Sequence, residues 1–410
     1  MKLRCLGDFV ELRQGLAINK GSAHLVSDTQ DITYCYPLLR IADMMDSNFS
    51  KFVSKDVNSS VIANPQDIIY TRTGQIGLAF RGMQGVVHNN SFIVSLKTDE
   101  LEKDYLYTVL NSNFVKKQAN SQAKNSVQPD LTHTMFKSIV IPVPDSREEQ
   151  NRISKIINNI NQKIQTNIQI NQELEAMAKT LYDYWFVQFD FPDQNGKPYK
   201  SSDGKMVYHP ELKREIPEGW EVEKIENIAQ TGSGGTPKST NVSYYSNGEI
   251  PWINSGELEQ TVITSTSNFI TEEGLNNSSA KLFPSGTILV AMYGATAGKV
   301  SFLTFEASTN QAICAIMLTD IRMRYYLKNV IEDLYQYLVK LSTGSARDNL
   351  SQDMIRNIKV VIPSNDILDR FYDFSNNIIK EITKKQQENE QLTQLRDWLL
   401  PMLMNGQVII

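Results

Sequence analysis

The feature that most constrains this sequence is a long internal repeat. Pro65 and Pro284 lie 219 positions apart (284 − 65), and Leu131 and Leu350 keep the same offset. Other pairs keep this offset or fall one short of it: Met135 with Met354, Pro144 with Pro363, Asn171 with Asn389, Leu174 with Leu392, and Leu181 with Leu399. Two unrelated domains that merely share turn residues would not hold one register over so many positions. The period is too long for a solenoid repeat, so the sequence predicts one duplicated domain.

Each half contains the same succession of elements. Short β-type runs come first, over residues 67–72 and 91–96 in the first half and over 287–292 and 311–318 in the second. A short apolar strand follows in each half, SIVIPVP and NIKVVIP, and ends in proline, which lacks the amide donor needed to continue a ladder. A long stretch with helical spacing begins at once, so we expect each half to end in a helix.

The two predicted helices are long and carry narrow apolar stripes. We expect the first over residues 146–187, with Ser146 as N-cap and Glu149 completing a capping box, and the second over residues 365–403. At 1.5 Å per residue each would be roughly 60 Å long, which favours a coiled-coil pair over one helix on a globular core. The stripes comprise Ile153, Ile157, Ile160, Ile164, Ile168, Leu174, Leu181 and Trp185, and Phe371, Ile378, Ile382, Leu392, Leu395 and Leu399.

Both stripes turn polar at equivalent positions, Asn171 and Asn389. An asparagine in such a seam sets the register of the helices at some cost in stability, or it marks a place where the seam is open. The sequence alone leaves these two interpretations equal.

Composition argues for a cytoplasmic protein without disulfides or a zinc site. The three cysteines, Cys5, Cys35 and Cys314, and the four histidines are scattered, without CxxC or HxxxH spacing. The N-terminal stretch MKLRCLGDF has no apolar segment typical of a signal peptide. No run approaches the roughly 18 apolar residues of a membrane span, so we expect no membrane partner.

The net charge of −5 argues at first against a nucleic-acid partner, but the charges are segregated. No acid occurs between Asp67 and Asp99 or between Glu273 and Glu306, and both windows contain lysine or arginine. Such windows can form a basic face on an acidic protein. They fit buried strands, which hold few charges of either sign, equally well.

No catalytic motif is found. The stretch GATAGK resembles a phosphate-binding loop, but it is one residue short and is followed by Val300 where a hydroxyl would bind magnesium. No GxGxxG opens a helix, no ExK follows Pro144-Asp145, and there is no GxSxG. We therefore expect no catalytic residue, cofactor or metal site in this chain.

Several phrases, taken in order, resemble the specificity subunit of type I restriction-modification systems. They are IPEGWEVEKI, SGGTP, IPWINSGEL, GTILVAMYGATAGKV, STNQAI, GSARDNLS and LRDWLLPMLMNGQV, together with the linker LYDYWFVQFDFPDQNGKPYKSS. The first half begins at LGDFVELRQG without an IPEGW lead or an SGGTP segment. Its recognition domain is therefore expected to be trimmed or divergent.

The resemblance implies an α+β fold with two duplicated mixed α/β target recognition domains separated by two long antiparallel coiled-coil helices. The expected domains are a first recognition domain over 1–145, a central conserved helix over 146–190, a linker over 191–220, a second recognition domain over 221–364 and a distal conserved helix over 365–410.

The resemblance also implies a chain without catalytic activity of its own. It would direct two methyltransferase subunits and the restriction (translocase) subunits to a bipartite site on double-stranded DNA. S-adenosylmethionine, ATP and magnesium would be bound by those partners. The alternatives are a methyltransferase or nuclease in its own right, a coiled-coil structural protein without a DNA role, and the specificity subunit of another multi-subunit restriction type.

The candidate DNA-binding residues are polar side chains near the glycine-punctuated loops of each half. Arg, Lys, Asn, Gln, Ser and Thr read base edges, mostly in the major groove. Taken singly, each candidate fits a solvated turn at least as well. They are Arg72, Thr73, Gln75, Lys124, Asn125 and Gln128 in the first half, and Thr236, Lys238, Tyr293, Thr296, Lys299, Ser345, Arg347 and Asn349 in the second.

Overall fold

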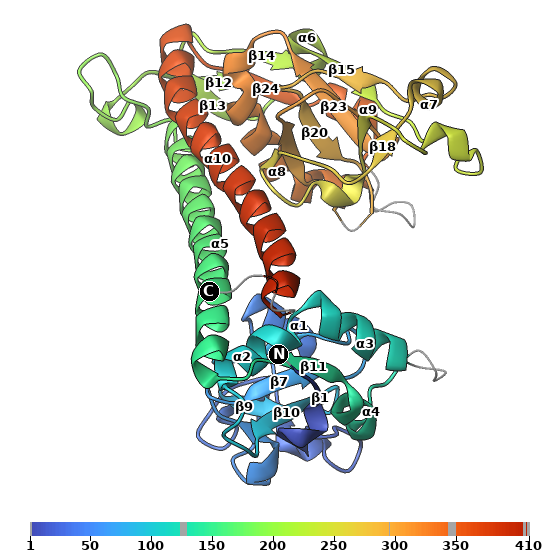
Figure 1. Cartoon of the computed structure of the whole chain (residues 1–410). Coiled ribbons are helices and arrows are strands. Elements are labelled where there is room, and N and C mark those ends of the chain that lie inside the picture. The colour runs from blue at the N-terminus through green and yellow to red at the C-terminus, as the bar shows by residue number, and fades with distance from the viewer. Residues whose placement is uncertain (1, 124–128, 295, 343–349, 405–406, 408–410) are drawn as a thin grey trace. The chain divides into compact units, whose positions relative to one another are not determined.

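The computed structural model describes residues 2–123, 129–294, 296–342, 350–404 and 407, and Figure 1 labels its helices and many of its strands. The chain forms two compact units: Met1–Gln165 with Glu390–Ile410, and Thr166–Asn389. Each unit therefore contains one recognition domain, the first part of the helix that follows it, and the last part of the other long helix. The domain boundaries expected from the sequence remain a prediction.

The described residues of the first unit form three β-sheets. A two-stranded sheet pairs β1 (Lys2–Cys5) with β11 (Val140–Val143). A second sheet has the order β2 (Val10–Gln14), β10 (Ser91–Leu96), β7 (Ile68–Thr71) and β8 (Ala79–Phe80). A third has the order β3 (Val26–Ser27), β5 (Phe52–Val53), β4 (Tyr36–Leu39), β9 (Gly85–Val87) and β6 (Ile62–Ala63). The helices α1 (Ile41–Asp46), α2 (Lys103–Leu110), α3 (Asn113–Ala123) and α4 (His133–Ser138) complete it.

The second unit repeats this plan. A two-stranded sheet pairs β14 (Glu221–Lys224) with β24 (Lys359–Ile362). The central sheet has the order β15 (Ala229–Ser233), β23 (Ile313–Leu318), β20 (Ile288–Ala291), β21 (Val300–Leu303) and β17 (Val262–Ile263). The third has the order β18 (Phe269–Ile270), β16 (Ile250–Ile253), β22 (Ala307–Thr309) and β19 (Leu282–Phe283). Its short helices are α6 (Ile225–Ile228), α7 (Glu272–Asn276) and α9 (Gln352–Arg356), and α8 spans Arg324–Ser342.

Strand register confirms the duplication. Cys5 pairs with Val140 in the first unit, and Lys224 pairs with Lys359 in the second. Each residue of the second pair lies 219 positions after its counterpart in the first (224 − 5 and 359 − 140). The strand β1 therefore occupies the place of β14. Gly15 and Gly234 follow equivalent strands, and a Cβ at either would collide with a backbone carbonyl of the neighbouring sheet. Of the two alternatives expected for the first domain, trimmed or divergent, the retained elements favour the second.

The long helices have nearly the expected bounds. Helix α5 spans Arg147–Tyr182 and continues as one π-helical turn over Asp183–Val187, and α10 spans Asn365–Met404. The Ser146 hydroxyl accepts a hydrogen bond from the Glu149 amide at 3.2 Å, as an N-cap does. The segment between them contains a hairpin of β12 (Met206–His209) and β13 (Arg214–Pro217). The linker expected over 191–220 contributes to the core of the second unit, because the Phe191 and Trp220 rings stack there with centroids 4.9 Å apart.

The two helices pack antiparallel. In the first unit Arg396 donates to Asn161 at 3.2 Å, and in the second Asn167 donates to Asn389 at 2.9 Å. As the residue number increases along α5, the number of its partner on α10 decreases, so the helices run antiparallel. This confirms the pair expected from the family resemblance. Two members of the predicted stripe, Ile168 at 38% and Leu395 at 43%, are exposed and so are not part of a buried seam.

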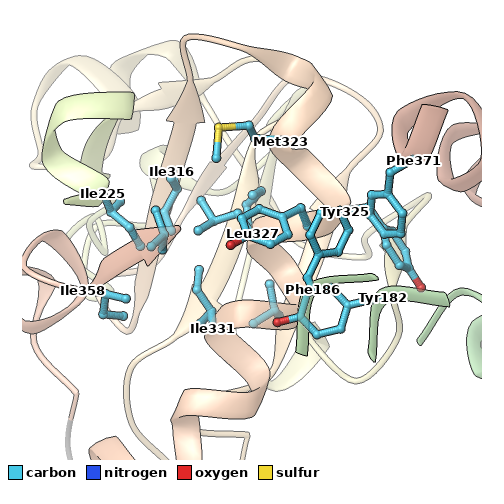
Figure 2. Close-up of a cluster of buried hydrophobic side chains, with 14 of the residues drawn as sticks. Tyr182, Phe186, Ile225, Ile316, Met323, Tyr325, Leu327, Ile331, Ile358 and Phe371 are labelled. Carbon is cyan, nitrogen blue, oxygen red and sulfur yellow. The ribbon is translucent and has the colours of Figure 1, made fainter. Parts of the chain in front are cut away.

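Apolar residues of both helices complete the two cores. In the first unit Ile153 and Ile157 of α5 and Leu400 and Leu403 of α10 are buried against the recognition domain. In the second unit Tyr182 and Phe186 lie against Phe371, Tyr325 and Ile331, as Figure 2 shows. The Phe186 and Phe371 rings meet edge to face with centroids 4.8 Å apart. Each recognition domain is thereby anchored to both helices.

Candidate nucleic-acid interface

In the first unit, three loop segments meet at Arg72, just past the end of β7. The Arg72 amide donates to the Asn90 carbonyl at 2.8 Å, and the Arg72 carbonyl accepts from the Leu131 amide at 3.0 Å. The Arg72 guanidinium pairs with Asp130 at 2.5 Å and is close to the Asn89 carbonyl. These contacts bring three segments together on one edge of the first unit: the loop over 72–78, the turn over 88–90 and the segment after 129. We call this the loop edge.

The second unit builds the same edge from other residues. The Met292 amide donates to the Ala312 carbonyl at 2.8 Å, and the Leu350 amide donates to the Met292 carbonyl at 2.7 Å. The loop that begins at Met292, the turn over 310–312 and the segment from Leu350 therefore converge as their counterparts do. The edge is a property of the repeated fold and does not depend on the side chain at position 72 or 292.

Glycines leave room at both edges. Gly74 has φ +73° and Gly294 has φ +91°, a backbone region that other residues rarely adopt. Among the described residues, no atom lies within 4 Å of the place where a Cβ would stand at Gly294, and only the tip of Ile41 reaches that distance at Gly74. A ligand can therefore approach the backbone of both loops closely.

Comparison with known proteins decides what these edges belong to. The sequence profile described as "Type I restriction modification DNA specificity domain" matches residues 1–176 and again 217–394. The chain belongs to this family. Its specificity subunits are non-catalytic and direct DNA target recognition within type I restriction-modification complexes, which confirms the function expected from the sequence.

Individual relatives agree with this assignment. The type I restriction enzyme MjaIX specificity subunit of Methanocaldococcus jannaschii is 26% identical, covering 83% of this chain and 77% of its own length. The HindI specificity subunit of Haemophilus influenzae is also 26% identical, with 79% and 81% covered. The crystal structure of a type I restriction-modification S subunit from M. genitalium has a TM-score of 0.59 at 13% identity, covering 98% and 95%, and shares the fold.

The structure places three predicted DNA-binding residues of this specificity subunit at the first edge. Gln75 is exposed, whereas Thr73 is half-buried and bridges to Asp130. The Arg72 side chain is only 19% exposed and its charge is offset by Asp130, so it orders the loops. Lys124, Asn125 and Gln128 lie outside the described residues.

In the second unit the predicted residues separate by exposure. Thr236, Lys238 and Lys299 are exposed, whereas Tyr293 packs partly against the core. Thr296 is 8% exposed, and its hydroxyl donates to the Ser255 carbonyl at 2.8 Å, so it holds its own loop. Ser345, Arg347 and Asn349 lie outside the described residues.

Sequence reasoning missed several amides at these edges. Gln311 is exposed and lies 2.5 Å from the Thr236 hydroxyl, and Gln352 is hydrogen-bonded to Thr231 and Ser233 at the end of β15. In the first unit Gln14 donates to the Asn89 carbonyl at 3.0 Å. The equivalence was hidden because Ser91 and Ile313, which open β10 and β23, are 222 positions apart (313 − 91) and not 219.

The two histidines of the first edge add no charge at neutral pH. Burial, and then the nearby Arg40, lowers the pKa of His88 below its usual value. Burial, and then Arg72 and Lys137, lowers the pKa of His133, whose ring packs edge-on against Phe92. Both are therefore neutral imidazoles that offer one donor and one acceptor.

Within the described part of the chain no helix has the length and apolar character needed to cross a membrane.

Proposed function

We propose that this specificity subunit reads a bipartite site on double-stranded DNA, with each recognition unit reading one part through its loop edge. The observation that carries the proposal is the repetition of that edge. Equivalent backbone hydrogen bonds assemble the same three segments at Arg72 and at Met292, while the exposed side chains around them differ. A repeated frame with different side chains suits two readers of different sequence, because base edges are distinguished by side-chain hydrogen bonds.

The side chains proposed to face DNA are the exposed polar ones of these edges: Gln75 in the first unit, and Thr236, Lys238, Lys299 and Gln311 in the second. Gln311 is the strongest candidate for a base contact. A glutamine amide pairs with adenine through one donor and one acceptor, and the Thr236 hydroxyl beside it would orient that amide.

The partners we propose are two methyltransferase subunits per chain and the restriction subunits, assembled in the cytoplasm. Two observations support a pair of docking places: the recognition unit is duplicated, and each unit is anchored to both long helices by buried side chains. S-adenosylmethionine, ATP and magnesium would be held by those partners. The stiff helix pair would set the gap between the two half-sites, because a gap is measured along the duplex.

Methylome sequencing of a host that carries this chain with its methyltransferase tests the proposal. We expect methylation at a two-part sequence with a fixed gap. Exchange of residues 1–145 for the matching region of a relative should alter one half-site and leave the other unchanged. Alteration of both half-sites, or methylation by the purified chain alone, would contradict the proposal.

A further inference from the structure

A cavity of about 290 Å³ in the second unit lies between α10 and the start of α8. The segment before β20 and the end of β21 also line it. It is away from the loop edge, because it is lined by Ser285 before β20 and Thr304 after β21, at the opposite ends of these strands from Met292 and Lys299. The cavity contains three cationic side chains, Arg324, Lys380 and Lys384. None of the described residues that line it is acidic.

Arg324 is an unusual arginine in this chain. Every other partly buried arginine in the described ranges pairs with a carboxylate within 4 Å, as Arg13 does with Asp67 and Arg322 with Asp320. Arg324 instead donates to the Asn376 side-chain oxygen at 3.0 Å and lies over the Phe302 ring at 5.4 Å.

The Arg324 guanidinium also has unused hydrogen-bonding capacity. Its Nε is buried and has no hydrogen-bond partner in the described part of the chain. Burial lowers the pKa of Arg324, which is the direction expected for a cation that lacks an anion. A buried charge is costly unless it is paired, so this geometry favours an anionic ligand that completes the site.

The two lysines add charge from one face of α10. Lys380 and Lys384 are four residues apart, one helical turn or about 6 Å, and both are exposed. Neither has a carboxylate partner among the residues described. The hydroxyl of Ser285 on the facing loop is a further potential donor, whereas the Thr304 hydroxyl already donates to the Ile263 carbonyl at 2.7 Å. Three cations and one hydroxyl form a donor set that matches the oxygens of a phosphate.

The repeat provides an internal comparison. The helix positions that correspond to Lys380 and Lys384, at the 218-residue offset of Asn171 and Asn389, are Gln162 and Thr166. In the first unit Arg81 is at the position of Phe302 on the equivalent strand and pairs with Asp104. The cluster of cations without acids is therefore specific to the second unit and is not required by the repeated fold.

We propose that this cavity is a phosphate-binding site, formed by Arg324, Lys380 and Lys384. The phosphate is a backbone phosphate of bound DNA outside the bases that are read, or it belongs to a free phosphate compound. The first source rests on the function proposed above, and the second does not.

The DNA source is tested with the chain assembled with its methyltransferase. The salt dependence of binding to a cognate duplex is compared for the unmodified complex, Arg324→Gln, and Lys380→Gln/Lys384→Gln, with Lys197→Gln as an exposed lysine control in the same unit. Loss of one phosphate contact should reduce the slope of log K against log salt by about 0.9, or roughly fivefold in affinity at 0.15 M salt, with unchanged base preference.

The free-phosphate source is tested on the same proteins without DNA. Inorganic phosphate stabilises folded proteins generally, so the measure is the rise in thermal midpoint over chloride at equal ionic strength. That rise should be larger for the unmodified chain than for the cavity variants. The double lysine variant keeps the test valid if Arg324→Gln fails to fold, because both lysines are exposed. If neither the salt slope nor phosphate stabilisation differs from the Lys197→Gln control, the proposal is overturned.

Two further outcomes distinguish a phosphate site from a protein-docking site and from a failure of the proposed function. Loss of methyltransferase assembly in the cavity variants, without a change in either phosphate assay, would mean that an acidic side chain of a partner protein fills the cavity, and would overturn it. If the unmodified complex shows no sequence preference in the same titrations, the function proposed above fails independently of the cavity.

Discussion

Replacing Asn167 with leucine tests what sets the register of the long helices. The Asn167 side chain is fully buried, and its amide donates to Glu388 and Asn389 at 2.9 Å each, whereas Asn171 reaches only the Ile382 carbonyl at 3.4 Å. The two asparagines that are equivalent in sequence therefore do not pair with each other. Stranding a buried partner of such hydrogen bonds costs about 1–3 kcal/mol.

The apolar ends of the helices contribute more. Each large side chain buried there, such as Phe371 in one core or Leu403 in the other, stabilises its packing by about 1.5–3 kcal/mol, and several are present in each unit. Because their sum exceeds the contribution of the amide layer, we expect the ends to hold the register and the amides to add stability only.

The expected results follow from this comparison. Asn167→Leu should lower the free energy of unfolding by about 1–3 kcal/mol, and adding Asn389→Leu should cost less than the sum of the single changes by about 0.5–3 kcal/mol. Chemical unfolding followed by circular dichroism measures both. Gln172→Leu, an exposed amide on the same helix, is the control and should change stability by less than about 0.5 kcal/mol. Methylome sequencing should give an unchanged gap for every variant. A shifted or mixed gap would refute the argument, since it would show that the amide layer holds the register.

Three further predictions concern the core of the second unit, a base-contacting residue and the gap between the half-sites. Phe371→Ala should lower the free energy of unfolding by about 3–5 kcal/mol, detected by the fluorescence of Trp185, whose ring is 6.0 Å away; a loss near that of the exposed Leu395→Ala would contradict the packing. Gln311→Ala should cost about 1–3 kcal/mol in binding and relax one position of one half-site, whereas an unchanged site would exclude a base contact. Four residues inserted after Thr166 lengthen α5 by about 6 Å and keep its face in phase, so both half-sites should be read across a wider gap. Two inserted residues rotate that face by about 200° and should abolish activity. Methylation across the original gap in either variant would show that the helices do not set the spacing.

Much of the architecture could be predicted from local pattern alone. The duplication followed from a constant offset, and the helix expected over 365–403 is observed over Asn365–Met404. The helix signal is short-range, because helical periodicity and the proline that ends the preceding strand depend on neighbouring residues. The offset needs only the order of residues along the chain. The same logic failed where two extra residues between β20 and β23 broke the offset, which concealed Gln311 as the counterpart of Asn89.

Which polar side chains are free to bind was decided by the tertiary structure. Arg72 and Thr296 look alike in sequence, as polar residues near glycines, but each is satisfied by a group far along the chain, Asp130 or the Ser255 carbonyl. The partner of Asn389 is likewise Asn167 and not its sequence equivalent. Sequence by itself determined the order, type and duplication of the elements, because these depend on local spacing. Only the folded chain determined which charges are neutralised and which, like Arg324, are not, because the partners come from distant segments that packing brings together.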